Sequence, residues 1–361
     1  MSTAQQTPLD VDAFVERLFH SVLGAADLVA IYLGDRLGWY RRLQAEGPLT
    51  AEELATRTST HPRYAREWLE QQAVTGIATV QNDPDPDRRR YSLPPAVAEV
   101  LTDEKSLSYL APLARMFAAA VTQLPALLDA YRNGGGVAWP QFGADARESQ
   151  ADMNRPWYEQ RLPLALAGVS SLDAALRRPG ARIADVGCGA GWSTIALSRA
   201  YPGASVDGID VDAASIEMAN ANAEAAGVAD RVGFTHADAE QMPVGPFDVI
   251  FAFECLHDMP HPVQVLHAAA QSLAPDGCVV VMDEAVGDEF PAPGDDVEQL
   301  MYAFSLTVCL PDGMSHPSSA ATGTVMRPAT LRRYGQEAGL AGFDILPIDD
   351  FGFWRFYRLT A

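Results

Sequence analysis

Apolar residues recur at helical spacing through the first part of the chain. Between Asp10 and about Leu43 they lie three or four positions apart, so they form one broad face of successive helices. Thr50 to Glu53 has the form Ser/Thr-x-x-Glu, in which each side chain accepts from a free amide at a helix start. This pattern predicts a helix that begins there and another over 61–74. The broad apolar face of the first helices predicts a contact between subunits, and hence a homodimer.

The following segment is typical of a winged helix. IATV and RRRYSL predict two short strands on either side of the turn NDPDPD, which completes a helix-turn-helix with a wing. DNA binding is one interpretation of that motif. However, residues 1–110 contain 11 Arg and Lys against 16 Asp and Glu, and the predicted recognition helix places two glutamates beside Arg63 and Arg66. Because affinity for DNA depends on a basic face, we expect no nucleic-acid partner.

The rest of the chain changes from helices to an alternation of strands and helices. Residues 105–180 predict helices interrupted by the loop Asn133-Gly134-Gly135-Gly136, and the runs ARIADVG, ASVDGID, VGFTHAD, FDVIFAFE and GCVVVMDE then alternate with helical stretches. Such alternation predicts an α/β fold with a mostly parallel sheet. We expect a winged-helix and dimerisation domain over 1–110, a helical linker with substrate-side helices over 111–178, and a Rossmann-like, ligand-binding domain over 179–361.

Composition limits the class of partner. The amino-terminal MSTAQQTPLD lacks a basic-then-apolar signal, and no stretch approaches the roughly 20 apolar residues of a membrane span, so we expect a cytoplasmic protein without a membrane partner. The four cysteines form no CxxC pair, which disfavours a zinc knuckle. Lys105 is the only lysine, and this excludes a P-loop. With a formal net charge of −21, the protein should bind a small molecule and repel phosphate-rich partners.

A glycine-rich turn follows the first strand of the alternating region. Asp185-Val186-Gly187-Cys188-Gly189-Ala190-Gly191 lies between a strand and a helix, where glycines let a ligand approach the backbone and the helix start offers free amides. The spacing is GxGxG. The dinucleotide fingerprint GxGxxG would need glycine at the position of Trp192, so binding of a nicotinamide dinucleotide is disfavoured.

Carboxylates stand beyond three successive strands. Asp210 ends the second strand, 25 residues after Asp185, where an acidic side chain accepts from ribose hydroxyls, and Asp238 ends the third and would accept from an adenine amino group. Three carboxylates suit a cofactor with a cationic sulfonium and no phosphate. They would otherwise be helix caps, but caps alone do not predict all three beside a glycine turn.

These residues belong to recognisable motifs. ADVGCGAGW, DGIDVD, HADA and FAFECLHDM resemble the motifs of class I S-adenosylmethionine (SAM)-dependent methyltransferases, and the whole chain, with NRPWYE, CLPDGM and ATGTVMRPATL, resembles bacterial methyltransferases that carry an N-terminal winged helix. The resemblance implies SAM as the cofactor, a seven-stranded sheet, and methylation of a small metabolite, with oxygen as the expected acceptor. It also implies cofactor contacts by Asp185, Gly187, Cys188, Gly189 and Gly191 (methionine part), Asp210 and Val211 (ribose and adenine edge), Asp238 and Ala239 (adenine), and Phe253 and Glu254 (sulfonium side).

His257 is the candidate catalytic residue. It follows the fourth strand in Leu256-His257-Asp258, where plant-type O-methyltransferases, which are similar in architecture, have their base. A histidine there would take the proton of a substrate hydroxyl, since its pKa lies near neutrality. The alternative is a histidine that only packs on the loop. A metal site of His257, Asp258 and His316 for C-methylation of an α-keto acid is a further alternative, but we expect no metal.

The insertion from Val286 to Arg327 predicts a substrate lid, because it is apolar and rich in aromatic residues. Core packing explains the same composition equally well. The substrate contacts expected from these regions are Met301, Tyr302 and His316, with Trp157 and Tyr158 opposite them. A SAM-sensing regulator and a non-methylating enzyme of the same fold remain as alternatives.

Overall fold

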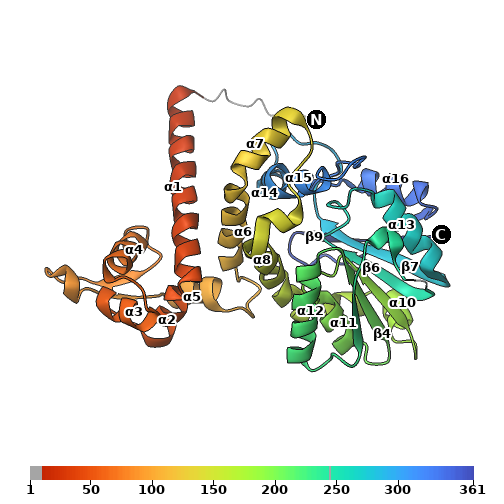
Figure 1. Ribbon diagram of the computed structural model, residues 1–361, viewed down its shortest axis with the longest axis horizontal. Helices are drawn as coiled ribbons and strands as arrows, with labels where there is room; N and C mark the ends of the chain where they lie inside the picture. Colours follow the sequence, from red (N-terminus) through yellow and green to blue (C-terminus); the bar gives the residue numbers. More distant parts are fainter. Residues whose placement is uncertain (1–9, 244) are drawn as a thin grey trace. The chain divides into compact units, whose positions relative to one another are not determined.

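The computed structural model describes residues 10–243 and 245–361 (Figure 1). Contacts between Cα atoms divide the chain into two compact units, Met1–Ala118 and Ala119–Ala361. Each unit has its own hydrophobic core and is described by itself.

The first unit is helical with a two-stranded wing. The capping box at Thr50 is present, since its hydroxyl accepts from the amide of Glu53 and the Glu53 carboxylate accepts from the amide of Thr50. The helix expected over 61–74 and the two wing strands are also confirmed. The elements are α1 (Val11–Arg36), α2 (Trp39–Glu46), α3 (Ala51–Thr58), α4 (Pro62–Val74), β1 (Thr79–Gln81), η1 (Pro86–Arg88), β2 (Arg90–Ser92), α5 (Pro95–Thr102) and the first part of α6 (Ala111–Thr122).

Helix α1 packs within this unit only near its C-terminal end. A Cβ on Gly34 would lie 2.4 Å from the ring of Trp68, so the helix approaches the core closely there. Arg115 Nε lies 3.1 Å from Asp35 Oδ2, an ion pair that is buried on both sides. Further toward the N-terminus, large apolar side chains of α1 are exposed in this chain, among them Phe14 (51%) and Leu18 (56%).

The second unit is an α/β domain. Its strands are β3 (Arg182–Val186), β4 (Ser205–Asp210), β5 (Val232–His236), β6 (Phe247–Phe253), β7 (Leu273–Glu284), β8 (Gly342–Ile345) and β9 (Trp354–Thr360). Its helices are the last part of α6, α7 (Leu124–Asn133), α8 (Trp139–Gln160), α9 (Leu162–Ala167), α10 (Ser170–Leu176), α11 (Trp192–Ala200), α12 (Ala213–Ala226), η2 (Ala239–Gln241), α13 (Pro262–Ser272), α14 (Asp296–Phe304), η3 (Ser305–Cys309), α15 (Leu310–Gly313) and α16 (Pro328–Glu337).

The sheet has seven strands in the order β5-β4-β3-β6-β7-β9-β8, and only β9 runs antiparallel to its neighbours. This confirms the predicted Rossmann-like, mostly parallel sheet. From β3 the chain proceeds outward through β4 and β5, and it then returns to add β6 on the other side of β3. In such a sheet a ligand crevice opens at the carboxyl ends of the strands where the order reverses, here β3 and β6.

Successive residues of each buried strand point to opposite faces of the sheet. In β6, Val249, Phe251 and Phe253 pack in one core with α9, α10 and α11, whereas Ile250 and Ala252 pack in the other core with α13 and α16. Helices therefore cover both faces (Figure 1). Because both faces are apolar, the polar residues of the strands collect at the strand ends.

The Asn133–Gly136 loop binds the insertion that follows β7. A Cβ on Gly136 would lie 1.9 Å from the carbonyl oxygen of Pro311, so only glycine fits there. The amide of Val137 donates to that same carbonyl at 2.9 Å, and the amide of Trp139 donates to Asp312 Oδ1 at 2.6 Å. Asp312 thus caps the N-terminus of α8 from a distant part of the sequence.

Among residues 10–243 and 245–361, no single helix has both the length and the apolar character needed to cross a membrane. Helices α6 and α7 satisfy these criteria only as a pair, and the pair is bent by 57°.

Candidate active site

The glycine turn joins β3 to α11, and its three glycines have different roles. Gly187, Gly189 and Gly191 all have positive φ, at 69°, 52° and 80°. A Cβ on Gly187 would lie 2.7 Å from Cys255 Sγ, and one on Gly191 would lie 2.7 Å from the ring of Phe234. A Cβ on Gly189, in contrast, would meet nothing within 4 Å. The first and third glycines are needed for packing, and open space lies at the middle one.

Asp185 lies directly before this turn and is fully buried. Its Oδ2 accepts from the hydroxyls of Ser193 at 2.6 Å and Thr194 at 2.5 Å in the first turn of α11. Burial raises the pKa of Asp185 to about 6, against the lowering effect of these two hydrogen bonds. Oδ1 has no hydrogen-bond partner among the described residues. A buried acceptor of this kind suits a ligand that brings a donor.

Asp210 connects the glycine turn to the loop after β4. Its Oδ2 accepts from the amide of Gly189 at 2.8 Å, and its Oδ1 accepts from the amide of Asp212 at 2.8 Å. Burial raises the pKa of Asp210, while the backbone donors lower it in part. Val211, between the two aspartates, is exposed. The carboxylate therefore fixes the spacing of two backbone segments at the crevice.

Asp238 lies differently from the sequence prediction. Strand β5 ends at His236, so Asp238 stands two residues beyond it and not at its end. Its side chain caps the short helix η2 by accepting from the amide of Glu240 at 2.9 Å, and Ala239 is the first residue of that helix. The amide of Ala237 still donates to the Asp210 carbonyl at 3.0 Å, so pairing with β4 stops just before Asp238, and the chain there turns into η2.

Phe253 is the last residue of β6, and Glu254 follows it. The ring of Phe253 packs against that of Tyr158, with centroids 5.6 Å apart. Glu254 has a φ of 53°, which is rare for a residue with a side chain. Burial raises its pKa to about 7, and Asn154 Nδ2 donates to Glu254 Oε2 at 2.6 Å. The backbone outlier and the buried carboxyl mark this position as strained, as residues at functional sites often are.

His257 is 2% exposed and lies among three carboxylates. Its Nδ1 is 3.1 Å from both oxygens of Asp283 and 3.3 Å from Glu284 Oε2, and its Nε2 is 3.3 Å from Asp258 Oδ1. Burial lowers the pKa of His257, but the three carboxylates outweigh it and raise that pKa well above its ordinary value. The imidazole therefore holds its proton more strongly than an ordinary histidine does.

Sequence reasoning missed Asp283 and Glu284, because GCVVVMDE looks like an ordinary strand with a polar end. His316 is exposed and does not belong to the groups of His257, Asp258 and Cys309, or of His257, Asp283 and Glu284, in which potential ligand atoms converge among the described residues. The alternative site of His257, Asp258 and His316 is therefore wrong as a grouping. That alternative required His316, the only histidine of the insertion, to lie beside His257.

The insertion nonetheless covers the His257 loop. The amide of Gly323 donates to the His257 carbonyl at 3.2 Å, and the amide of Ala320 donates to the Pro260 carbonyl at 2.8 Å. These bonds explain why His257 is almost inaccessible in this conformation.

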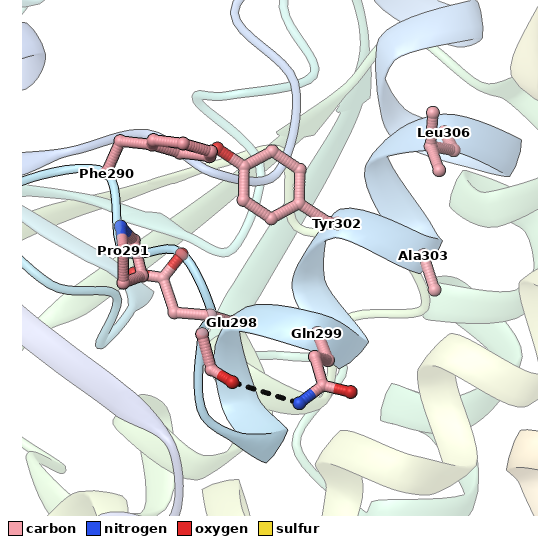
Figure 2. A pocket seen from close by; sticks show the side chains of 8 residues that line it. Phe290, Pro291, Glu298, Gln299, Tyr302, Ala303 and Leu306 are labelled. Carbon is pink, nitrogen blue, oxygen red and sulfur yellow. Dashed lines mark hydrogen bonds between the residues drawn. The ribbon is translucent and has the colours of Figure 1, made fainter. Parts of the chain in front are cut away.

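The five expected substrate residues have different surroundings. Trp157 packs with Phe351 and Trp354, whereas Tyr158 and Met301 are buried. Tyr302 lines a shallow pocket on the outer side of α14, where its ring meets that of Phe290 edge-on (Figure 2). Met301 precedes Tyr302 on the same helix but is buried, so the two side chains do not line the same surface.

Comparison with known proteins assigns these units. Residues 183–277 match the family described as "Methyltransferase domain", and residues 25–103 match the "Rv2258c-like winged HTH domain". Residues 183–277 therefore form a methyltransferase domain. The structure of the mitomycin 7-O-methyltransferase MmcR is similar over 97% of this chain and 98% of that one, with a TM-score of 0.72 and 22% identity, which shows a shared fold.

Two curated relatives match part of the chain. The 27-O-demethylrifamycin SV methyltransferase of Amycolatopsis mediterranei is 39% identical over 34% of this chain and 44% of its own length. The ubiquinone biosynthesis O-methyltransferase of Psychrobacter cryohalolentis is 28% identical over 45% of this chain and 64% of its own length. The matched region thus spans about half the length of these relatives.

Proposed function

We propose that the protein transfers the methyl group of SAM to an oxygen atom of a small-molecule metabolite. The observation that carries this proposal is the open space at Gly189, whose amide donates to the half-buried Asp210, four residues after the buried Asp185. The named relatives, which methylate a rifamycin, a mitomycin and a ubiquinone precursor according to their names, support a small-molecule acceptor.

The residues at the crevice fit this cofactor. Asp185 Oδ1 is a buried acceptor with no hydrogen-bond partner among the described residues, which suits the ammonium of the methionine part, and the acidic surroundings disfavour a phosphate-bearing ligand. When bound, SAM supplies a methyl group on a cationic sulfur. We assign the methionine part to Asp185, Gly187, Cys188, Gly189 and Gly191, the ribose and adenine edge to Asp210 and Val211, the adenine to Asp238 and Ala239, and the sulfonium side to Phe253 and Glu254.

The chain contributes mainly alignment and exclusion of water. Reacting groups held in line can gain several kcal/mol over free encounter. We further propose that His257 accepts the proton of the substrate hydroxyl, with Asp283 orienting its Nδ1. This base role requires the imidazolium to lose its proton first, and Nε2 is the nitrogen that would then accept. Substrate contacts by Trp157, Tyr158, Met301, Tyr302 and His316 would require the insertion after β7 to move, and we propose them on that condition.

We propose that the winged-helix unit mediates dimerisation and not DNA binding. The arginines of its recognition helix are paired within the chain: Arg63 Nη2 lies 2.5 Å from Glu67 Oε2, and Arg66 pairs with Asp87. A cytoplasmic location agrees with the four free thiols, which are typical of a reducing compartment.

The cofactor assignment predicts a specific loss on mutation. Asp210→Ala should weaken the binding of SAM and of its demethylated product about 10–150-fold, because hydrogen bonds of a charged, buried acceptor contribute roughly 1.5–3 kcal/mol. Titration calorimetry measures both affinities. Asp207→Ala is the control, since Asp207 lies three residues earlier on β4 and only pairs with Arg182 at 3.7 Å. Unchanged affinity in Asp210→Ala would remove Asp210 from the site.

The base role of His257 predicts a pH dependence with a definite sign. The unprotonated fraction of His257 grows as pH rises, so wild-type turnover should increase with pH. Because the pKa of His257 is raised, this increase should occur at a higher pH than for an ordinary histidine. His257→Gln should be about 10²–10⁴-fold slower at high pH and insensitive to pH, with SAM affinity nearly unchanged. His267→Gln, on α13, is the control. A His257→Gln enzyme within about threefold of wild type at every pH would leave positioning alone as the mechanism.

The exposed apolar face of α1 predicts a dimer. A patch of this extent is rare on a monomer, and two charges within it should prevent association. The double variant Phe14→Asp, Leu18→Asp should sediment as a monomer, whereas Val80→Asp in the wing should remain dimeric. A wild-type protein that sediments as a monomer at micromolar concentration would contradict the proposal.

A further inference from the structure

We propose that Arg147 of α8 is a positioning residue for the adenosyl-binding loop, acting through Asp212 on Asp210. This inference rests on the proposed use of SAM. Arg147 lies outside the segment that matches the methyltransferase family, and no motif in the sequence singled it out.

Arg147 and Asp212 form a two-pronged ion pair. Arg147 Nε donates to Asp212 Oδ2 at 2.6 Å, and Nη2 donates to Asp212 Oδ1 at 2.9 Å. The side chains are 13% and 8% exposed, so water competes little with either bond. Parallel hydrogen bonds between a guanidinium and a carboxylate fix orientation as well as distance. Asp212 therefore has one defined position relative to α8.

The backbone amide of Asp212 connects this ion pair to Asp210 and, through Asp210, to the glycine turn. Its amide donates to Asp210 Oδ1 at 2.8 Å, and Asp210 Oδ2 accepts from Gly189 at 2.8 Å. Asp212 Oδ2 also caps α12 by accepting from the amide of Ser215 at 3.0 Å and its hydroxyl at 2.8 Å. Helix α8, the start of α12 and the glycine turn are thus connected through two neighbouring aspartates.

Charge makes the arginine necessary. Asp210 and Asp212 are two carboxylates held close together with little water, and each disfavours the ionised form of the other. The guanidinium of Arg147 and the Ser215 donors offset burial and lower the pKa of Asp212, so that it stays ionised. Without Arg147, the loop would relieve the repulsion by moving apart, and Asp210 would lose its defined place at the ribose end.

Other segments of the chain hold helix α8 at its N-terminus and in its later part. Its N-terminus is capped by Asp312, and its later part carries Asn154, which binds Glu254 at 2.6 Å. Gly143, with φ 75° and ψ −161°, interrupts the helix between the capped end and Arg147. The segment after Gly143 therefore contacts Asp212 through Arg147 and Glu254 through Asn154, residues that we assign to the adenosyl side and the sulfonium side.

The test separates the adenosyl end from the methionine end. Titration calorimetry with S-adenosylhomocysteine and with 5′-methylthioadenosine, which lacks the amino-acid part, should show that Arg147→Gln weakens both ligands by the same factor, about tenfold or more, as is typical when a residue supporting a ligand contact is lost. Arg147→Lys keeps the charge but not the two-pronged geometry, so its loss should be smaller.

Arg327→Gln is the matched control. Arg327 makes a similar two-pronged pair with Glu298, at 3.1 and 3.2 Å and comparable burial, far along the sequence in the insertion. It should bind both ligands within twofold of wild type, and its melting temperature should show whether loss of such a pair alone unfolds the domain. If Arg147→Gln is poorly folded, Arg147→Lys supplies the comparison.

Three results would overturn the inference. Arg147→Gln and Arg147→Lys could bind both ligands as wild type does, or they could lose affinity for S-adenosylhomocysteine while binding 5′-methylthioadenosine normally, which would place Arg147 at the methionine end. A wild-type protein that binds neither ligand would instead refute the proposed function itself, and this inference with it.

Discussion

The carboxylate of Asp210 accepts one backbone amide from the glycine turn and one from the loop after β4, and the geometry of the crevice depends on this pair of bonds. The turn needs positive φ at all three glycines, so it has little rigidity of its own. The half-buried carboxylate of Asp210, a charge-assisted acceptor at the end of β4, holds it in one shape. Once the turn is fixed, the buried Asp185 and the open space at Gly189 face the same ligand.

The second constraint on the site is that the carboxylates around His257 outnumber the cationic groups that could neutralise them. Asp258, Asp283 and Glu284 surround one imidazole, and Glu284 Oε2 has no hydrogen-bond partner among the described residues. Such a group is costly to bury, so it stays protonated or shares a proton with its neighbours. A neutral or cationic acceptor molecule fits these surroundings better than an anionic one, because three carboxylates around a single imidazole would repel a further carboxylate.

Much of the fold could be predicted from local sequence. The capping box at Thr50 and the glycine turn each depend on a few adjacent residues, and both appear where the sequence places them. The partners of Arg147 and His257 could not be predicted, because Asp212 and Asp283 lie 65 and 26 residues away and become neighbours only through the strand order. The predictions for the end of β5 and for His316 failed for the same reason. Tertiary contacts decide where the pairing of two strands ends and which side chains of an insertion face solvent.

Methyl transfer to a small molecule can be measured directly by following a labelled methyl group from SAM. Purified protein would be incubated with methyl-labelled SAM and a low-molecular-mass extract of the source cells, with Asp210→Ala in parallel. Label should move into a small organic molecule with wild-type protein and much more slowly with the variant. Label that stays in SAM, or that appears only in protein or nucleic acid when these are added, would contradict it.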